Sequence, residues 1–168
     1  MNRFFITLGY SGLSPKAPGT VGTLVSLPLG VLVLIYFGSY TLFLATALIS
    51  IIAIKEINKY EEKTGTHDDK SIVIDELAGM WFALSVAPAF SVPMGEVMLL
   101  ENGFLVQILL SFALFRYFDI TKPSIIGRID ANTKGGLGVM GDDIIAGFAA
   151  GISSALLWQG WVYISAYL

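Results

Sequence analysis

Two pairs of adjacent carboxylates are the residues of this chain best suited to chemistry. Asp75 and Glu76 lie in the segment SIVIDELAG, and Asp142 and Asp143 lie in GLGVMGDDIIAGFAAG. Small residues follow Asp75 at i+3 and i+4, and they follow Asp143 at the same offsets. This spacing lets two helices approach closely. If these two helix faces meet, the four carboxylates converge on one point.

Carboxylates surrounded by apolar sequence indicate a metal site. A buried charge is costly unless it is paired or binds a metal, and hard cations such as Mg²⁺ prefer carboxylate oxygens. The absence of cysteine and the presence of a single histidine argue against zinc. We predict Asp75, Glu76, Asp142 and Asp143 as ligands, with Asp119 as a fifth. The alternative is helix capping, which explains one acid per helix better than two adjacent pairs.

The segment SPKAPGTVGT, Ser14–Thr23, could hold a phosphate. Glycines let backbone N–H groups turn toward a ligand, and a Gly-rich loop that leads into a helix N-terminus is a common phosphate site. We therefore predict Lys16, Gly19, Thr20 and Thr23 as substrate-binding residues. The spacing is not that of a Walker loop. An ordinary Pro/Gly turn with a threonine cap explains the segment equally well.

A second group of candidates carries positive charge or titrates near neutral pH. Arg116 lies three residues before Asp119, so the two share a helix face, and Arg116 and Lys122 could bind a phosphate held near a metal. Alternatively, such basic residues set membrane topology or attract anionic lipid; this fits Lys134 better than Lys122. The one histidine, His67, is a candidate general acid or base, or a solvated loop residue.

The composition is that of an integral membrane protein. The 168 residues are 55% hydrophobic and 14% charged, whereas soluble domains are about 25% charged. The length suits one domain, residues 1–168. The net charge of −3 carries no signature of nucleic-acid binding. The N-terminal segment lacks a full apolar region and cleavage site, so we predict no signal peptide.

Apolar runs predict an all-α fold with about five membrane helices, since ~20 residues span a bilayer. The long run after residue 20 is divided at Gly38-Ser39, and its two parts are short enough that a re-entrant hairpin remains an alternative. The predicted spans are Val21–Phe37, Tyr40–Ile57, Ile72–Phe90, Gly103–Phe118 and Asp143–Tyr163, with a polar loop over Asp119–Gly136.

The distribution of charge predicts the orientation of these spans. Five crossings place all ten Lys and Arg residues on one side, together with every acid except Glu96 and Glu101. The positive-inside rule makes that side cytoplasmic. The carboxylates therefore lie at the cytoplasmic ends of the helices, where a phospholipid headgroup or a cytosolic ion would be the substrate.

Four blocks of the chain together resemble the phosphatidylglycerophosphatase A family. They are SGLSPKAPGTVGT, THDDKSIVIDELAGMW, FRYFDITKPSIIGRID and GGLGVMGDDIIAGF, in the family's order over Ser11–Gly151. The chain departs from the resemblance at Asp69 and Lys70, where other members can carry different residues, and at Ser124, where a tryptophan would be familiar. These departures concern substrate contacts rather than the reaction.

The resemblance implies a Mg²⁺-dependent phosphatase of the bacterial inner membrane that converts phosphatidylglycerophosphate to phosphatidylglycerol. The carboxylates would hold one or two Mg²⁺ ions, and an unligated carboxylate or His67 would accept a proton from water. An aspartyl nucleophile, the oligomeric state and the acyl-chain preference stay open. Three other classes also remain: a small ion transporter with intramembrane acids, a metal-dependent lipid phosphotransferase, and a scaffold protein that needs none of these acids.

Overall fold

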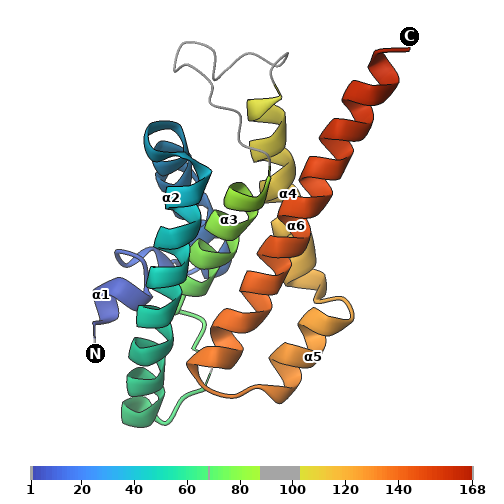
Figure 1. The fold of residues 1–168 in the computed structure, drawn as a ribbon. Coiled ribbons are helices and arrows are strands. Elements are labelled where there is room, and N and C mark those ends of the chain that lie inside the picture. The colour runs from blue at the N-terminus through green and yellow to red at the C-terminus, as the bar shows by residue number, and fades with distance from the viewer. Residues whose placement is uncertain (1, 68, 88–102, 168) are drawn as a thin grey trace.

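The described part of the chain is helical throughout. The computed structural model describes residues 2–67, 69–87 and 103–167, and no strand occurs among them. The elements in order are α1 (Arg3–Ile6), the 3-10 helix η1 (Ser11–Leu13), α2 (Pro18–Thr64), α3 (Ile74–Val86), α4 (Phe104–Thr121), α5 (Ile125–Asn132) and α6 (Gly136–Ser165). This confirms the all-α prediction. The three longest helices and α3 lie side by side, and α5 crosses near one end of them (Figure 1).

Helix α2 is interrupted at the predicted position. Gly38 has φ 80° and ψ 170°, which are not helical angles, and glycine adopts them without the penalty that a Cβ imposes. Figure 1 shows the chain reversing direction there, so that α2 consists of two arms. Both arms extend beyond the predicted spans, because the helix begins at Pro18 and continues to Thr64.

Helices α3 and α6 pack through their small residues, as the spacing predicted. A Cβ added at Gly147 would lie 2.9 Å from the carbonyl carbon of Gly79, and one at Gly151 would lie 2.7 Å from the carbonyl oxygen of Ala83. The two backbones therefore touch directly. This contact brings the carboxylates of the two helices together. Helix α3 ends at Val86, since Ala87 has ψ 134°, and residues 88–90 of the predicted span lie outside the described residues.

This contact yields a stability prediction. We expect Gly147→Ala to lower the free energy of unfolding by about 1–3 kcal/mol, because the added methyl group overpacks the α3–α6 contact. Gly160→Ala in the same helix is the matched control, since a Cβ there meets nothing within 4 Å. Thermal unfolding in detergent, followed by circular dichroism, compares the two. Equal midpoints for both variants would contradict the close contact.

Helix α6 begins earlier than predicted, and this changes the setting of its aspartates. It starts at Gly136, where Asn58 accepts a hydrogen bond from the Gly136 N–H at 2.7 Å. Asp142 and Asp143 thus lie in its second turn rather than at its start, so helix capping does not account for them. The predicted polar loop was also wrong in part, since it contains the end of α4 and all of α5. A Cβ at Gly136 would lie 2.8 Å from the Ile54 Cα, so the close packing of this helix start against α2 requires glycine.

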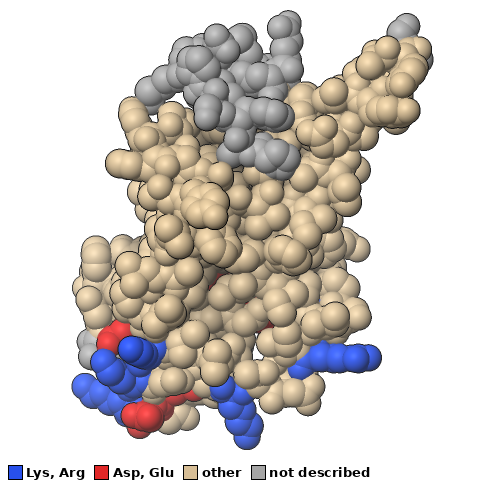
Figure 2. All heavy atoms as spheres, viewed as in Figure 1, with Lys and Arg blue, Asp and Glu red and all other residues tan. Residues whose placement is uncertain are grey.

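Three described helices are long and apolar enough to cross a membrane: Pro18–Thr64, Phe104–Thr121 and Gly136–Ser165. Much of their apolar surface is exposed, as at Leu48, Ile51, Leu109 and Leu156, which is expected of a surface that faces lipid. On the face that Figure 2 shows, the Lys and Arg side chains gather near the lower end of the molecule, and the surface above them carries almost no charged residues. The count of about five crossings stays a prediction.

Candidate active site

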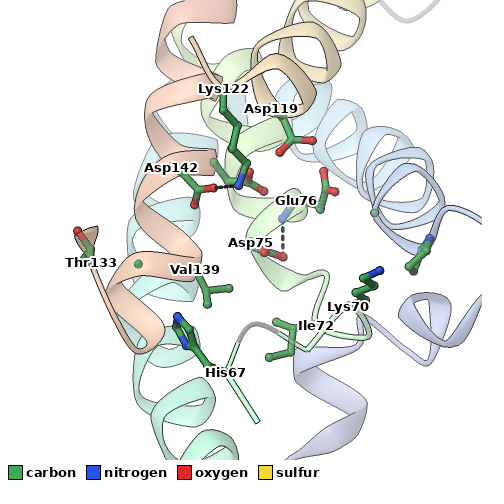
Figure 3. A pocket seen from close by; sticks show the side chains of 14 residues that line it. His67, Lys70, Ile72, Asp75, Glu76, Asp119, Lys122, Thr133, Val139 and Asp142 are labelled. Carbon is green, nitrogen blue, oxygen red and sulfur yellow. Dashed lines mark hydrogen bonds and ion pairs between the residues drawn. The ribbon is translucent and has the colours of Figure 1, made fainter. Parts of the chain in front are cut away.

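A polar cavity of about 400 Å³ lies where the starts of α2 and α3 meet the end of α4 and the first turns of α6 (Figure 3). It collects all five predicted metal ligands. Its lining residues are Asp75, Glu76, Asp119, Asp142, Asp143, His67, Lys70, Lys122, Thr133, Pro18, Gly19, Ile72, Gly138 and Val139. Carboxylates that are far apart in the sequence thus line one cavity.

Glu76 is held tightly at the wall of this cavity. It lies in the first turn of α3, where the helix dipole favours acids, and only 8% of its surface is exposed. Its Oε2 accepts a hydrogen bond from Thr23 Oγ1 at 2.7 Å. A Cβ at Gly19 would collide with Glu76 Oε1, so any larger residue there would displace the Glu76 carboxylate. The Pro/Gly-rich segment therefore packs directly against a carboxylate.

Arg116 pairs with two of the carboxylates. Its Nη1 lies 2.5 Å from Glu76 Oε2 and 2.8 Å from Asp119 Oδ2. Its Nη2 donates to Thr20 Oγ1 at 3.3 Å, and its Nη1 donates to Thr23 Oγ1 at 3.2 Å. None of Arg116, Thr20 and Thr23 lines the cavity. Arg116, Thr20 and Thr23 therefore hold the Glu76 and Asp119 carboxylates in position from outside the cavity.

The two aspartates of α6 have different surroundings. Lys122 follows the last residue of α4 in a left-handed conformation, with φ 42°, and its Nζ lies 2.7 Å from Asp142 Oδ2. Asp143 Oδ2 is buried and has no hydrogen-bond partner among the described residues. A buried carboxylate oxygen without a partner is costly. Asp143 is therefore the aspartate that most needs a cation.

Glu76, Asp119 and Asp143 together could hold a metal ion. Each offers one carboxylate oxygen, and these three oxygens lie within 4.8 Å of one another. A single guanidinium faces three negative groups here, so a divalent cation would stabilise the cluster, and an all-oxygen donor set suits a hard cation. Asp75 and Asp142 line the same cavity but are not part of this trio.

The remaining predicted residues lie at the edge of the site or outside it. His67 lines the cavity, and its Nδ1 lies 2.7 Å from Glu61 Oε1. Figure 3 shows His67 at the lower rim, near Val139. Gly19 lines the cavity at the first turn of α2. Lys16 is exposed and is not among the lining residues.

Two polar residues that line the cavity were not among the predicted site residues. Lys70 and Thr133 both line it. Lys70 was noticed only as a departure from a family pattern. The signal that could have revealed it is its position five residues before Asp75, in the segment that must lead into α3. Nothing in the spacing of Thr133 indicates a place in the site.

Comparisons with known proteins identify the family of this chain. The sequence profile described as phosphatidylglycerophosphatase A matches residues 4–158. A phosphatidylglycerophosphatase A of Haemophilus influenzae is 37% identical over 140 residues, which cover 83% of this chain and 78% of the relative. The Escherichia coli protein of the same name is 35% identical over 144 residues, covering 84% and 75%.

A third relative carries a different name. It is a putative phosphatidylinositol-3-phosphatase of Bacteroides thetaiotaomicron, 33% identical over 141 residues that cover 82% of this chain and 80% of the relative. No solved structure matches the chain significantly. The profile match covers most of the chain, and the relatives exceed 30% identity over most of their length. This chain belongs to the phosphatidylglycerophosphatase A family.

Proposed function

We propose that this protein hydrolyses the terminal phosphomonoester of phosphatidylglycerophosphate. One water molecule is consumed, the bond between phosphorus and the glycerol oxygen breaks, and phosphatidylglycerol and inorganic phosphate are released. Family membership and the two relatives named phosphatidylglycerophosphatase A support this substrate. The observation that carries the chemistry is the trio of Glu76, Asp119 and Asp143 beside a polar cavity.

We assign the trio to Mg²⁺. The cluster is all oxygen, the chain has no cysteine, and Asp143 has a buried oxygen with no hydrogen-bond partner in the described part of the chain. A bound Mg²⁺ would supply charge for the phosphoryl oxygens and would lower the pKa of a water. Arg116, with Thr20 and Thr23, keeps Glu76 and Asp119 in place, which fixes the site before substrate arrives.

The other lining residues receive separate roles. Asp75 lines the cavity but is not part of the trio, and its Oδ1 accepts a hydrogen bond from the Glu76 N–H at 3.0 Å. We assign Asp75 the role of general base, which accepts the proton of the attacking water. Lys122 donates a hydrogen bond to Asp142. We assign its ammonium group a second contact, with a phosphate oxygen of the substrate. The N–H of Gly19, in the first turn of α2, contributes a further donor. His67 lies on the rim, where its ring bonds Glu61.

The setting of this reaction is a bacterial inner membrane, with the cavity on the cytoplasmic side. Two features support this: the apolar helices, and the restriction of all ten basic residues to one predicted side. The acyl chains would lie along the apolar helix surfaces, with the headgroup in the cavity. Exposed Lys16 would attract anionic lipid to this end of the protein.

Phosphate release tests the proposal. We expect phosphate release from phosphatidylglycerophosphate in nonionic detergent with Mg²⁺, and its loss after the purified protein is treated with EDTA, since the trio would then lack its cation. Returning Mg²⁺ should restore turnover. Soluble glycerol 3-phosphate should be a poor substrate, because it lacks the lipid that binds along the helices.

Other results of these assays would favour a different substrate or a different function. Phosphatidylinositol 3-phosphate belongs in the same assay because of the relative named for it. Faster turnover of that lipid would change the substrate, whereas release from neither lipid would exclude phosphatase activity. Flux of ions into liposomes without phosphate release would favour a transporter, and transfer of phosphate to a second lipid would favour a phosphotransferase.

A further inference from the structure

We propose that Lys70 binds a phosphate oxygen of the substrate at the cavity mouth, and that Tyr60 and Asp69 position it there. This inference rests on the proposed phosphatase function and adds a substrate-binding residue to it. Lys70 lines the cavity while its side chain stays exposed. It therefore stands where a headgroup enters.

The charges that line the cavity leave Lys70 available to an anion. Lys122 pairs with Asp142 at 2.7 Å, and the His67 ring bonds Glu61. Among the described residues, the Lys70 ammonium has neither an ion-pair nor a hydrogen-bond partner. Figure 3 shows Lys70 and Lys122 on different sides of the carboxylates. A phosphate dianion in this cavity would meet strong repulsion from the carboxylates that line it, so a cation without a partner favours its binding.

The backbone that carries Lys70 is a tight turn, Asp69–Ile72. The Ile72 N–H donates to the Asp69 carbonyl oxygen at 2.8 Å, and the Val73 N–H donates to the Ile6 carbonyl oxygen at 3.0 Å. Ile72 and Val73 are 5% and 1% exposed. Lys70 is thus the exposed member of a turn whose following residues are anchored in the core.

The Asp69 side chain fixes this turn to α2. Tyr60 Oη donates to Asp69 Oδ2 at 2.6 Å, and the Ser71 N–H donates to Asp69 Oδ1 at 2.9 Å. These two hydrogen bonds hold the pKa of the Asp69 carboxyl below its usual value, and the bond from Tyr60 has the larger effect. The carboxylate therefore stays ionised and accepts both bonds. Because the turn is fixed in advance, less freedom is lost when Lys70 binds a phosphate.

The test separates a specific contact from general attraction to the membrane. In nonionic detergent with phosphatidylglycerophosphate and Mg²⁺, we expect Lys70→Ala to raise KM about tenfold, the scale of one charge-assisted hydrogen bond. Its kcat should stay within about twofold, since a contact made equally in the ground and transition states changes KM alone. Lys70→Arg should keep most of the affinity. Lys63→Ala removes the same charge from an exposed position on α2 that does not line the cavity, and should leave KM unchanged.

The positioning role needs a coupled measurement. Tyr60→Phe removes only the hydroxyl that holds Asp69, and we expect it to raise KM about threefold in the wild-type background, part of one hydrogen bond. In the Lys70→Ala background it should raise KM no further, because Tyr60 acts through Lys70. An equal rise in both backgrounds would show that Tyr60 acts independently and would overturn this part.

A binding measurement keeps this inference separate from the proposed function. The Kd of phosphatidylglycerophosphate is measured in the same detergent without Mg²⁺, for the wild type and for Lys70→Ala. If the wild type binds this lipid but does not hydrolyse it, the phosphatase proposal fails while an increased Kd for Lys70→Ala still supports the contact. If Lys70→Ala has the wild-type KM and Kd, or if Lys63→Ala is equally impaired, the contact is disproved.

Discussion

Asp143→Asn is expected to lower kcat for phosphatidylglycerophosphate by about 10²–10³-fold, the loss seen when one preorganised electrostatic group is removed from an active site. Asp143 contributes an oxygen to the proposed metal site, and its Oδ2 is buried without a hydrogen-bond partner among the described residues. An amide occupies nearly the same volume but carries no charge. The fold should therefore persist while Mg²⁺ binding weakens.

Two comparisons make this result specific. Glu62→Gln neutralises an exposed acid outside the cavity and should retain wild-type turnover. Asp143→Asn should also require a higher Mg²⁺ concentration for half-maximal activity, which a purely structural defect would not cause. Wild-type phosphate release at the same Mg²⁺ concentration would show that Asp143 is not a ligand.

Arg116→Ala is expected to cost about 3–5 kcal/mol of stability, the usual effect of removing one partner from a buried ion pair. The guanidinium is mostly buried and contacts both Glu76 and Asp119. Without it, those carboxylates face Asp143 with no positive charge between them. Thermal unfolding in detergent without divalent cations measures the loss, and adding Mg²⁺ should recover part of it.

The matched variants for Arg116 test the cause of this loss. Arg128→Ala removes an exposed arginine of α5 and should unfold like the wild type. Arg116→Ala combined with Glu76→Gln should regain stability, since it removes one of the unpaired charges, but it should not regain activity. If the double variant is no more stable than Arg116→Ala, the ion pair does not explain the loss.

Several features followed from local sequence alone. The small residues after Asp75 and Asp143 predicted that two helices would touch, and α3 and α6 do so at Gly79 and Gly147. Gly38 marked the break in α2. These predictions succeeded because each depends on one residue type, or on spacing within one helix, and not on what packs against it.

The partners of each side chain could not be predicted in the same way. Arg116 was expected to share a helix face with Asp119, as it does, but its contacts with Glu76, Thr20 and Thr23 were not predicted. Thr23 is far from Glu76 in the chain, and spacing carries no information about such a distant pair. The start of α6 was also misjudged, because Gly135–Gly138 resembles a loop until the close approach of α2 is known.

The sequence by itself determined the chemical type of this protein: carboxylates in apolar surroundings, no thiol, one histidine and basic residues restricted to one predicted side. The cost of burying charge makes such a pattern meaningful wherever the chain folds. Only the tertiary structure showed which of the acids lie close together. It grouped Glu76, Asp119 and Asp143 within 4.8 Å and placed Lys122 on Asp142. It also placed Lys70 in the cavity lining, because distances between helices depend on packing across the whole fold.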